Sequence, residues 1–474
     1  MRPQWLTAPG HPGKGFNPSR LTVIKYLLCA PWQYFRPRFE GIISMGLQIL
    51  HAIITVNPTY GGPIEGIVQT SREHRRRGNS VEILSLDDPD DRLLVQCEFV
   101  CHAVGPGLGK YRYSPRLVPW LRANASKFDF IIVNGIWNYT SFGVWRALHG
   151  SGIPYYVFTH GMLDPYFKKH YPLKHLKKML YWPCAEYRVL RDANAVFFTC
   201  EEERLLARQS FHPYRCNEHV VNYGTAGAVG DPQMQRELFL SKFPHLRGKR
   251  NLLFLGRIHE KKGIDLTLKA LAQCVKDAPK DKVNDVQLII AGPDNGEYAS
   301  ALKALCYELQ LTERVTWAGM LGNDLKWGAF FVSDAFVLNS HQENFGVSVA
   351  EALSAALPTL ITDKVNIWRE IEEAGAGFVD TDDLAGAVRL LRRWLGASRA
   401  EWADIRTRAR ECFTSRFHIA LSTQSLLDGL AMYAGNEAQA HALRRDSAGT
   451  VRRPPLGNQA AVGAASKSSG HPAQ

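Results

Sequence analysis

The chain has no long uninterrupted apolar run and no leader-like N-terminus. A membrane-spanning helix needs about 18 to 20 consecutive apolar residues. The best candidate, GIISMGLQILHAIITV, is interrupted by Gln48 and His51 and ends in a turn sequence, as a β-strand does. The compact basic, apolar and small-residue order of a secretory signal is not found either. We therefore expect neither a spanning helix nor a secretory leader.

The cysteines form no paired motif. None makes a CxxC pair, and Cys97 and Cys101 have no second pair at zinc-binding spacing. An odd, scattered set is typical of buried thiols in a reducing compartment, so we expect a cytoplasmic protein. The nine are Cys29, Cys97, Cys101, Cys184, Cys200, Cys216, Cys274, Cys306 and Cys412.

The positive charge is concentrated at the two ends of the chain. The net charge is +12, and residues 1–44 and 436–474 supply about two thirds of it. The basic balance is therefore weak evidence for nucleic acid, and we expect no nucleic-acid partner. Both ends are rich in Pro or in Gly, Ala and Ser, so we expect them to be poorly ordered. Translation from Met45 is an alternative to Met1 that the sequence leaves open.

From residue 48 onward, short apolar strands alternate with helical stretches. The length of 474 residues is enough for two domains. Strand candidates in the first half are QILHAIITV, SVEILSL, FDFIIVNGI, PYYVFTHG and NAVFFTC. Those in the second half are NLLFLGRI, VQLIIAG, RVTWAGM, DAFVLNS and PTLITD. Alternation of this kind predicts an α/β fold, with two doubly wound Rossmann-like domains facing a cleft.

A segment without a strand, near residues 225–249, separates the two halves. Ligands of doubly wound sheets bind beyond the C-terminal ends of the strands, so we look for the site there. The predicted division is an extension over 1–44, domains over 45–225 and 250–415, a helix over 416–435 that packs back toward the first domain, and a disordered tail over 436–474.

The stretch HQENFGVSVAEALSAALP, residues 341–358, places two glutamates eight positions apart. It predicts a loop and a helix whose first amides, at Phe345, Gly346 and Val347, are free to bind an anion. Glu351 lies one turn inside that helix among apolar neighbours. A buried, unpaired carboxylate costs several kcal/mol, and sugar hydroxyls would supply donors to it. The alternative is that Glu351 pairs with a lysine or an arginine.

A second motif, FLGRIHEKKG, occupies residues 254–263 between a predicted strand and a helix that begins near Ile264. Arg257 can donate two hydrogen bonds to phosphate oxygens, and Lys262 adds a point charge. The alternative is a solvated charged turn.

Together these motifs resemble those of the family 4 retaining glycosyltransferases, which have the two-domain GT-B architecture. The resemblance covers roughly residues 46–432. GRIHEKKG is similar to that family's donor-diphosphate motif, ENFGVSVAE to its paired-glutamate motif, YGGP to its glycine loop and THGMLDP to its histidine motif. Four motifs in this order are specific, whereas each alone is weak.

The resemblance implies that a hexose moves from a nucleotide-diphosphate sugar to a growing surface polysaccharide or a lipid-linked saccharide. The nucleotide sugar is the substrate, and no cofactor or metal is implied. The second domain then binds the donor and the first faces the acceptor. Arg257 and Lys262 would hold the diphosphate, Glu343 the transferred sugar, and Glu351 the ribose hydroxyls.

The resemblance also assigns roles in the first domain. Gly61 and Gly62 would let the backbone approach the diphosphate, and His160 would contact the sugar near the reaction centre. The alternative for His160 is a structural histidine at a strand end. The family often has a histidine where this chain has Asn134, a position that we expect to face the acceptor. Retention would come from same-face attack, with the donor phosphate as the base.

Two further stretches carry charge. Asp88 and Asp90, in DDPDDR, have the DxD spacing that binds Mn or Mg in another glycosyltransferase architecture, but a solvated loop is the expectation and we predict no catalytic metal. Residues 165–183 contain five lysines, no acidic residue and several aromatic residues. This segment predicts a helical surface for the inner, anionic face of a membrane, and the alternative is a plain basic face.

Other functions remain to be separated from the leading one. A nucleotide-sugar isomerase of the 2-epimerase type shares the architecture but lacks the paired-glutamate motif. Isomerisation of a nucleotide sugar without any acceptor would identify it. A non-catalytic scaffold would show no thermal shift with nucleotide sugars. A phosphorylase of this fold would need a pyridoxal-binding lysine, for which the sequence has no signal.

Overall fold

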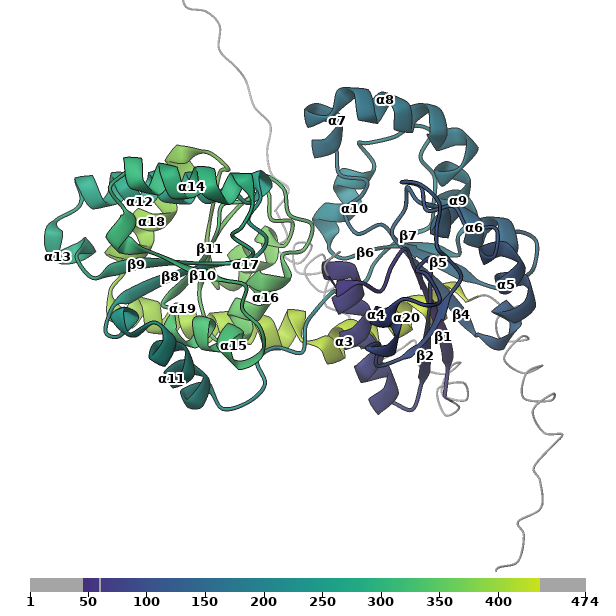
Figure 1. Cartoon of the computed structure of the whole chain (residues 1–474), viewed down its shortest axis with the longest axis horizontal. Coiled ribbons are helices and arrows are strands. Elements are labelled where there is room, and N and C mark those ends of the chain that lie inside the picture. Colours follow the sequence, from purple (N-terminus) through teal and green to yellow (C-terminus); the bar gives the residue numbers. More distant parts are fainter. Residues whose placement is uncertain (1–45, 59–60, 435–474) are drawn as a thin grey trace, which may run out of the picture. The chain divides into compact units, whose positions relative to one another are not determined.

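The computed structural model describes residues 46–58 and 61–434 (Figure 1). Seven strands form the first sheet in the order β3-β2-β1-β4-β5-β6-β7, and every neighbouring pair is parallel. The chain therefore winds outward from β1 in both directions. The strands are β1 (Gln48–Ile53), β2 (Ser80–Ser85), β3 (Val100–Ala103), β4 (Phe130–Asn134), β5 (Tyr155–Phe158), β6 (Ala195–Phe198) and β7 (Glu218–Val220).

The second sheet repeats this winding with six parallel strands in the order β10-β9-β8-β11-β12-β13. The predicted α/β class with two doubly wound sheets is confirmed. The strands are β8 (Arg250–Leu255), β9 (Val286–Ala291), β10 (Val315–Gly319), β11 (Ala335–Leu338), β12 (Thr359–Thr362) and β13 (Gly377–Asp380).

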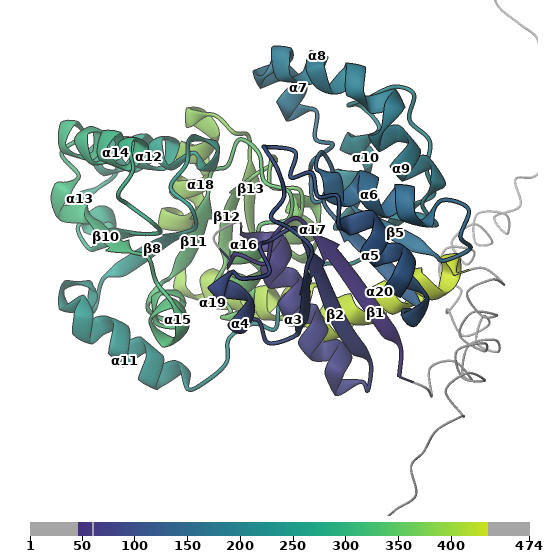
Figure 2. The same ribbon diagram turned by 45° about the vertical axis from the view of Figure 1, so that its right-hand side comes forward.

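Helices cover both faces of each sheet (Figures 1 and 2). Those of the first half are α3 (Gly62–Arg76), α4 (Arg92–Val95), α5 (Leu117–Asn124), α6 (Tyr139–Leu148), α7 (Tyr166–His170), α8 (Pro172–Tyr181), α9 (Glu186–Asp192) and α10 (Glu201–Ala207). Those that follow are α11 (Pro232–Lys242), α12 (Ile264–Asp277), α13 (Lys280–Val283), α14 (Glu297–Glu308), α15 (Asn323–Val332), α16 (Val347–Ser354), α17 (Trp368–Ala374), α18 (Leu384–Gly396), α19 (Arg399–Cys412) and α20 (Ile419–Tyr433).

Strand β1 shows why its sequence is nearly all apolar. Leu50 and Ala52 pack into one core cluster, whereas Ile49 and Ile53 pack into clusters on the other face. A strand buried on both faces reads as a continuous apolar run, since alternate side chains enter different cores. The same burial makes the central strands of both sheets easy to recognise from sequence.

Three strands were not predicted: β3, β7 and β13. Each pairs with a single neighbour and lies at an edge of its sheet. Most of their residues are half-buried, and none is fully buried. They therefore lack the apolar run by which the central strands were recognised.

Helix α20 packs on the first sheet although it follows the second in sequence. Leu426 and Leu430 belong to a core cluster of first-sheet residues, and the Tyr156 hydroxyl donates to the Leu430 carbonyl at 2.9 Å. The first sheet ends before residues 225–249 and the second begins after them. The exact domain limits within that segment stay a prediction. The predicted extension over 1–44 and tail over 436–474 lie outside the described residues.

The basic segment over 165–183 is not one helix. It forms α7 and α8, which separate at Tyr171, directly before Pro172. Proline has no N–H and is tolerated in the first turn of a helix, so it begins α8 here. Within residues 46–58 and 61–434, no helix is both long enough and apolar enough to span a bilayer.

Candidate functional site

The predicted donor motifs meet at the point where the second sheet reverses its winding. Strands β8 and β11 are neighbours, and the chain leaves them toward β9 and β12 on opposite sides. Lys262 lies in the loop after β8 and Glu343 in the loop after β11. Their side chains form a salt bridge, Lys262 Nζ to Glu343 Oε2. The two motifs, about 80 residues apart in sequence, are therefore joined by opposite charges at the usual ligand position of such a sheet.

The first turn of α16 presents unused backbone donors beside this ion pair. Gly346 is the N-cap residue with φ 77°, a left-handed conformation that glycine adopts readily. No acceptor among the described residues takes the N–H groups of Phe345, Gly346 and Val347. The Phe345 ring is buried and packs 5.1 Å from the Tyr223 ring. A helix start with free amides is an anion-binding geometry.

Arg257 lies exposed after β8, in the same loop as Lys262. No carboxylate in the described part of the chain forms an ion pair with it. A second lysine, Lys261, lies 4.1 Å from the ring centre of Phe167 on α7 and donates to Gln342. Burial lowers its pKa. The cations of this loop therefore differ in their surroundings. Arg257 is exposed to solvent, whereas Lys262 forms an ion pair with Glu343.

Glu351 is not an unpaired carboxylate. The residue is 5% exposed, and its Oε1 accepts a hydrogen bond of 2.5 Å from Lys326 Nζ on α15. Burial raises the pKa of Glu351, and the Lys326 charge opposes that rise. The alternative left open by the sequence, a lysine partner, is what the structure has. Lys326 was missed because it precedes Glu351 by 25 residues on another helix.

The glycine loop before α3 leaves open space for a ligand. Gly61 has φ 94°, and its N–H donates to the Pro58 carbonyl at 3.0 Å. A β-carbon at Gly61 or at Gly62 would meet no atom within 4 Å. The positive φ at position 61 is therefore one that favours glycine. The empty space at both positions would let a ligand approach the backbone closely.

His160 lies after β5 with φ 47°, a rare conformation for a residue with a side chain. Its Nε2 is 3.2 Å from Asn134 Oδ1, and Asn134 Nδ2 is 3.1 Å from His51 Nδ1. Because the amide nitrogen can only donate, this network assigns the His51 proton to Nε2 and a His160 proton to Nε2. Burial lowers the pKa of His51 to about 3 and that of His160 to about 4.

Asn134 is 4% exposed, and both ends of its amide are engaged by the two histidines. That this position faces an acceptor stays a prediction, since these contacts involve protein groups alone. They support an indirect role in which Asn134 orients His160. A small pocket lined by Asn134, His160, Tyr223 and Pro63 lies beside the pair.

Glu203 is a central residue that the sequence did not reveal. It is 3% exposed, and its carboxylate accepts from Gly161 N–H at 2.6 Å, from Thr159 and from Thr199. Asn344, next to Glu343, also donates to it, at 3.3 Å. One carboxylate thus holds the His160 loop and contacts the Glu343 loop. The sequence TCEEERL gave no signal, since three successive glutamates in a helix start read as a solvated face.

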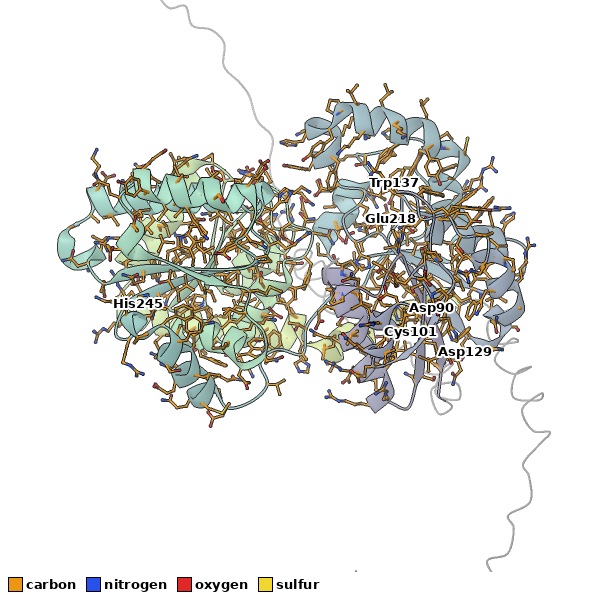
Figure 3. The ribbon with its side chains drawn as sticks, in the orientation of Figure 1. Asp90, Cys101, Asp129, Trp137, Glu218 and His245 are labelled. Carbon is orange, nitrogen blue, oxygen red and sulfur yellow. The ribbon has the colours of Figure 1, made fainter. Side chains whose placement is uncertain are left out.

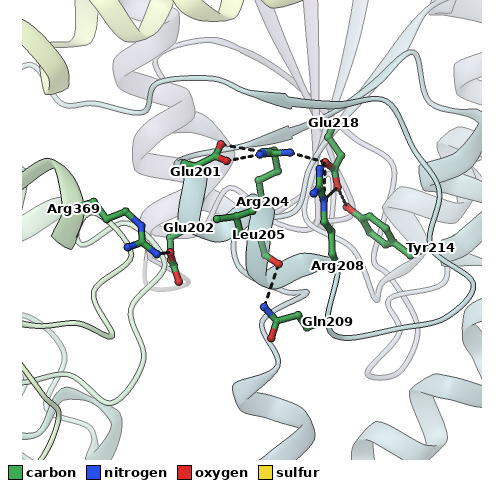
Figure 4. Close-up of polar contacts among 9 residues, drawn as sticks. All are labelled: Glu201, Glu202, Arg204, Leu205, Arg208, Gln209, Tyr214, Glu218 and Arg369. Atoms are coloured by element: carbon green, nitrogen blue, oxygen red, sulfur yellow. Dashed lines mark hydrogen bonds and ion pairs between the residues drawn. The ribbon is translucent and has the colours of Figure 1, made fainter. Parts of the chain in front are cut away.

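Helix α10, which carries Glu203, is anchored on two sides (Figure 4). Arg204 donates to Glu218 on β7 at 3.0 Å. Glu202 pairs with Arg369 of α17 at 2.6 Å. These contacts fix the helix and hence the position of the buried carboxylate.

Asp88 and Asp90 form a local turn. The Asp90 N–H donates to Asp88 Oδ1 at 3.1 Å, and both side chains are exposed. Asp90 lies in the first half of the chain (Figure 3). Across the described ranges, no group of three or more His, Cys, Asp or Glu residues is placed to hold a metal ion.

Comparisons with known proteins agree with this geometry. The model of the family described as glycosyl transferase 4-like domain matches residues 61–224, and that of glycosyl transferases group 1 matches residues 235–411. A GDP-mannose:cellobiosyl-diphosphopolyprenol alpha-mannosyltransferase of Xanthomonas oryzae pv. oryzae is 25% identical over 388 residues, 78% of this chain and 93% of that protein. An alpha-monoglucosyldiacylglycerol synthase of Streptococcus pneumoniae is 29% identical over 42% of this chain and 44% of that protein.

Solved structures match the fold of the whole described chain. The crystal structure of Anabaena HepE in complex with UDP and glucose has a TM-score of 0.64 at 17% identity, covering 81% of this chain and 100% of that one. A sucrose-phosphate synthase of Thermosynechococcus elongatus has a TM-score of 0.65 at 18% identity and covers 81% and 99%. With both family models matching in sequence order on this two-sheet fold, the chain belongs to the family 4 glycosyltransferases of GT-B architecture.

Proposed function

We propose that the protein is a retaining hexosyltransferase that moves a hexose from a nucleotide-diphosphate sugar to a lipid-linked saccharide or a growing surface polysaccharide. The observation that carries this proposal is the Lys262–Glu343 ion pair beside the free amides of α16. A cation, a carboxylate and unused N–H groups lie together at the C-terminal ends of β8 and β11. They fit a sugar diphosphate, which has both anionic oxygens and hydroxyl groups.

The cations and amides would act on the leaving diphosphate. Arg257 is exposed and can donate two parallel hydrogen bonds, while Lys262 would share its charge between Glu343 and a phosphate oxygen. The amides of Gly346 and Val347 add fixed donors. Preorganised donors aimed at developing negative charge are usually the largest catalytic contribution. These positive groups are the basis for proposing that transfer from the nucleotide sugar, the donor substrate, needs no metal and no cofactor.

The carboxylates would act on hydroxyl groups. Glu343 is held by its backbone, since its N–H donates to Lys364 and its carbonyl accepts from Asn366, so its side chain is set toward the β8 loop. It would bind the transferred hexose. Glu351, neutralised by Lys326, would bind the ribose without leaving an isolated buried charge.

His160 would contact the sugar from the other side of the site. Its pKa of about 4 keeps the ring neutral at pH 7, so it can accept a hydrogen bond from a hydroxyl through Nδ1 while Asn134 holds Nε2. A neutral ring avoids repelling the positive charge that develops at the anomeric carbon. Retention would follow from attack on the face that the diphosphate leaves, with a donor phosphate oxygen taking the acceptor proton.

A lipid-linked acceptor fits the outer face of α8. Leu173, Leu176 and Leu180 are 82%, 59% and 75% exposed, and they follow one another at helical spacing of three and four residues. Lys174 and Lys177 are exposed on the same helix. An apolar stripe flanked by lysines matches the surface of an anionic bilayer. We propose that the protein binds peripherally at the cytoplasmic face of the membrane through α8, in polysaccharide biosynthesis of the exopolysaccharide type.

The experiment that tests the donor half is a panel of nucleotide sugars read by thermal stabilisation. Binding raises the free energy of unfolding by RT ln(1 + [L]/Kd), about 2.7 kcal/mol at 100-fold excess over Kd. Wild type should be stabilised by one nucleotide sugar, and the double variant Arg257→Ala/Lys262→Met should not. Equal stabilisation of both proteins would remove the proposed phosphate contacts.

A further inference from the structure

Lys178 differs from the other lysines of α8 because its ammonium points inward. It lies 4.3 Å from the ring centre of Trp137, in the loop between β4 and α6. In the described part of the chain it has no hydrogen bond and no ion pair. The buried carboxylate of Glu186 acts on it electrostatically and raises the pKa of Lys178, but the two groups form no ion pair. Lys178 is thus a half-buried cation over an aromatic face, and no anion of the described residues lies within ion-pair distance of it.

Trp137, labelled in Figure 3, has a strained backbone and lies against this lysine. Its φ is 70°, a conformation that is costly for a residue with a bulky side chain. The backbone N–H of Trp137 donates to Glu186 Oε1 at 2.8 Å, and the fully buried Glu186 also accepts from the Ser141 hydroxyl. Its ring packs 4.9 Å from that of Phe211. The buried carboxylate and the aromatic contact fix the ring against which Lys178 lies.

This pair is directly connected to the His160 loop. The Trp137 indole N–H donates to the Met162 carbonyl at 3.1 Å, and Met162 is two residues beyond His160. Trp137 is also three residues beyond Asn134, which holds His160. The loops after β4 and β5 therefore both connect His160 with Trp137, at the C-terminal edge of the first sheet.

We propose that Lys178 and Trp137 form a binding subsite for the phosphate group of a lipid-linked acceptor, with the Lys178 ammonium as the phosphate ligand. This inference rests on the proposed function and adds the acceptor group that the first domain recognises. Helix α8 then has two roles on two faces. Its outer leucines contact lipid, and its inner lysine takes the phosphate that joins the lipid to the saccharide, directing the saccharide toward His160.

Burial supports this assignment. It lowers the pKa of Lys178 to about 8, so the ammonium remains mostly charged at pH 7 but gains little from solvent. A phosphate would supply the contacting anion that Lys178 lacks among the described residues. Exposed Lys177, one residue earlier on α8, offers a matched comparison because it has no described ion-pair partner either and lies on the solvent side.

The test measures binding of farnesyl diphosphate, a short prenyl diphosphate, by calorimetry. All proteins carry Arg257→Ala and Lys262→Met, so that the donor-phosphate cations do not bind the probe. Lys178→Met keeps the aliphatic stem over Trp137 and should weaken binding about 10-fold or more, as loss of a charge-assisted hydrogen bond does. Lys178→Arg should restore most of the affinity, and Lys177→Met should leave it unchanged. Inorganic pyrophosphate should show the same order with lower affinity.

Three results would overturn the inference: equal affinity of Lys178→Met and its parent, an equal loss in Lys177→Met, or a Lys178→Met effect confined to phosphatidylglycerol vesicles. The last would make Lys178 part of the membrane surface only. Melting temperatures of all variants must match for the comparison to count as binding. Thermal shifts of Lys178→Met with nucleotide sugars, in the otherwise wild-type chain, separate the two proposals. If those shifts persist while farnesyl diphosphate is unaffected, only the phosphate subsite fails.

Discussion

Gly161 and Asn344 are in direct contact: a β-carbon at Gly161 would lie 2.8 Å from the Asn344 side chain. Gly161 follows His160 and Asn344 follows Glu343, so the loops that carry the two proposed sugar contacts touch each other. Glu203 binds both loops from beneath, through Gly161 N–H and the Asn344 amide. The relative position of His160 and Glu343 thus depends on one glycine and one buried carboxylate.

Replacing Glu203 with glutamine should lower kcat more than it changes the donor Kd. The glutamine NH2 would face a backbone N–H, either that of Gly161 or that of Thr199, and one accepted hydrogen bond would become a donor–donor contact. An unsatisfied buried donor costs about 1–3 kcal/mol, so kcat should fall about 10-fold or more if the loop moves. Steady-state kinetics and nucleotide-sugar binding by calorimetry measure the two effects separately.

Glu201→Gln is the matched control on the same helix, since Glu201 is exposed and, among the described residues, its ion pair is with Arg204. It should keep both kinetics and stability. A Glu203→Gln protein with a lower melting temperature but wild-type kcat would show that the carboxylate supports the fold and does not position His160.

Glu343 and Glu351 should have separable kinetic effects. Glu343 faces Lys262, and its sugar contact should strengthen as positive charge develops at the anomeric carbon, so Glu343→Gln should mainly lower kcat. Ribose is bound about equally in the ground and transition states, so Glu351→Gln should mainly raise the donor KM. Kinetics of both variants with a saturating acceptor give the two parameters.

The Lys326 contact allows a structural role to be tested independently. Lys326→Met leaves Glu351 buried without its partner and should lower stability. Saturating donor should restore part of the loss if Glu351 binds the ribose. If Glu351→Gln changes the melting temperature and no kinetic parameter, then Glu351 is only the structural partner of Lys326.

The leucines of α8 should determine membrane binding. Changing Leu173, Leu176 and Leu180 together to serine removes exposed apolar surface and should abolish most sedimentation with phosphatidylglycerol vesicles. Changing Lys174 and Lys177 to glutamate should weaken binding by about 1 kcal/mol per lysine, and only to anionic vesicles. Because these side chains are exposed, the melting temperature should not change. Unaltered sedimentation of the serine variant would remove the membrane role of α8.

The buried histidines predict acid sensitivity. Burial lowers the pKa of His51 from 6.5 to about 3 and that of His74 to about 4. The unfolded chain takes up protons near pH 6.5 while the folded chain does not, so stability is lost as the pH falls below 6.5 toward these values. Each histidine contributes up to about 1.4 kcal/mol per pH unit. Urea unfolding of wild type and His51→Gln from pH 7 to pH 4.5 should give a shallower slope for the variant, and parallel slopes would contradict the prediction.

The sequence indicated those residues of the candidate site that lie within one loop. The motifs around Lys262 and Glu343 were recognisable because glycines and charges interrupt apolar strands there, and central strands have continuous apolar runs. Contacts between distant segments were not recognisable. Lys326 on α15 binds Glu351 on α16, and Glu203 on α10 binds the loops that contain Gly161 and Asn344. No local sequence pattern distinguishes Lys326 or Glu203 from solvated charges. Edge strands such as β7 were missed for the related reason that partial burial leaves no apolar run.

Product analysis is the most direct test of glycosyl transfer from a nucleotide sugar by this protein. The nucleotide sugar that stabilises the protein, labelled in its sugar, is incubated with and without a prenyl-diphosphate-linked saccharide, and the products are identified by mass spectrometry and NMR. We expect label on the acceptor alone, with the donor's anomeric configuration. We also expect a rate about 10²- to 10³-fold lower for Lys262→Met, as for loss of one anion-stabilising group. An isomerised nucleotide sugar formed without acceptor, or an inverted linkage in the product, would contradict it.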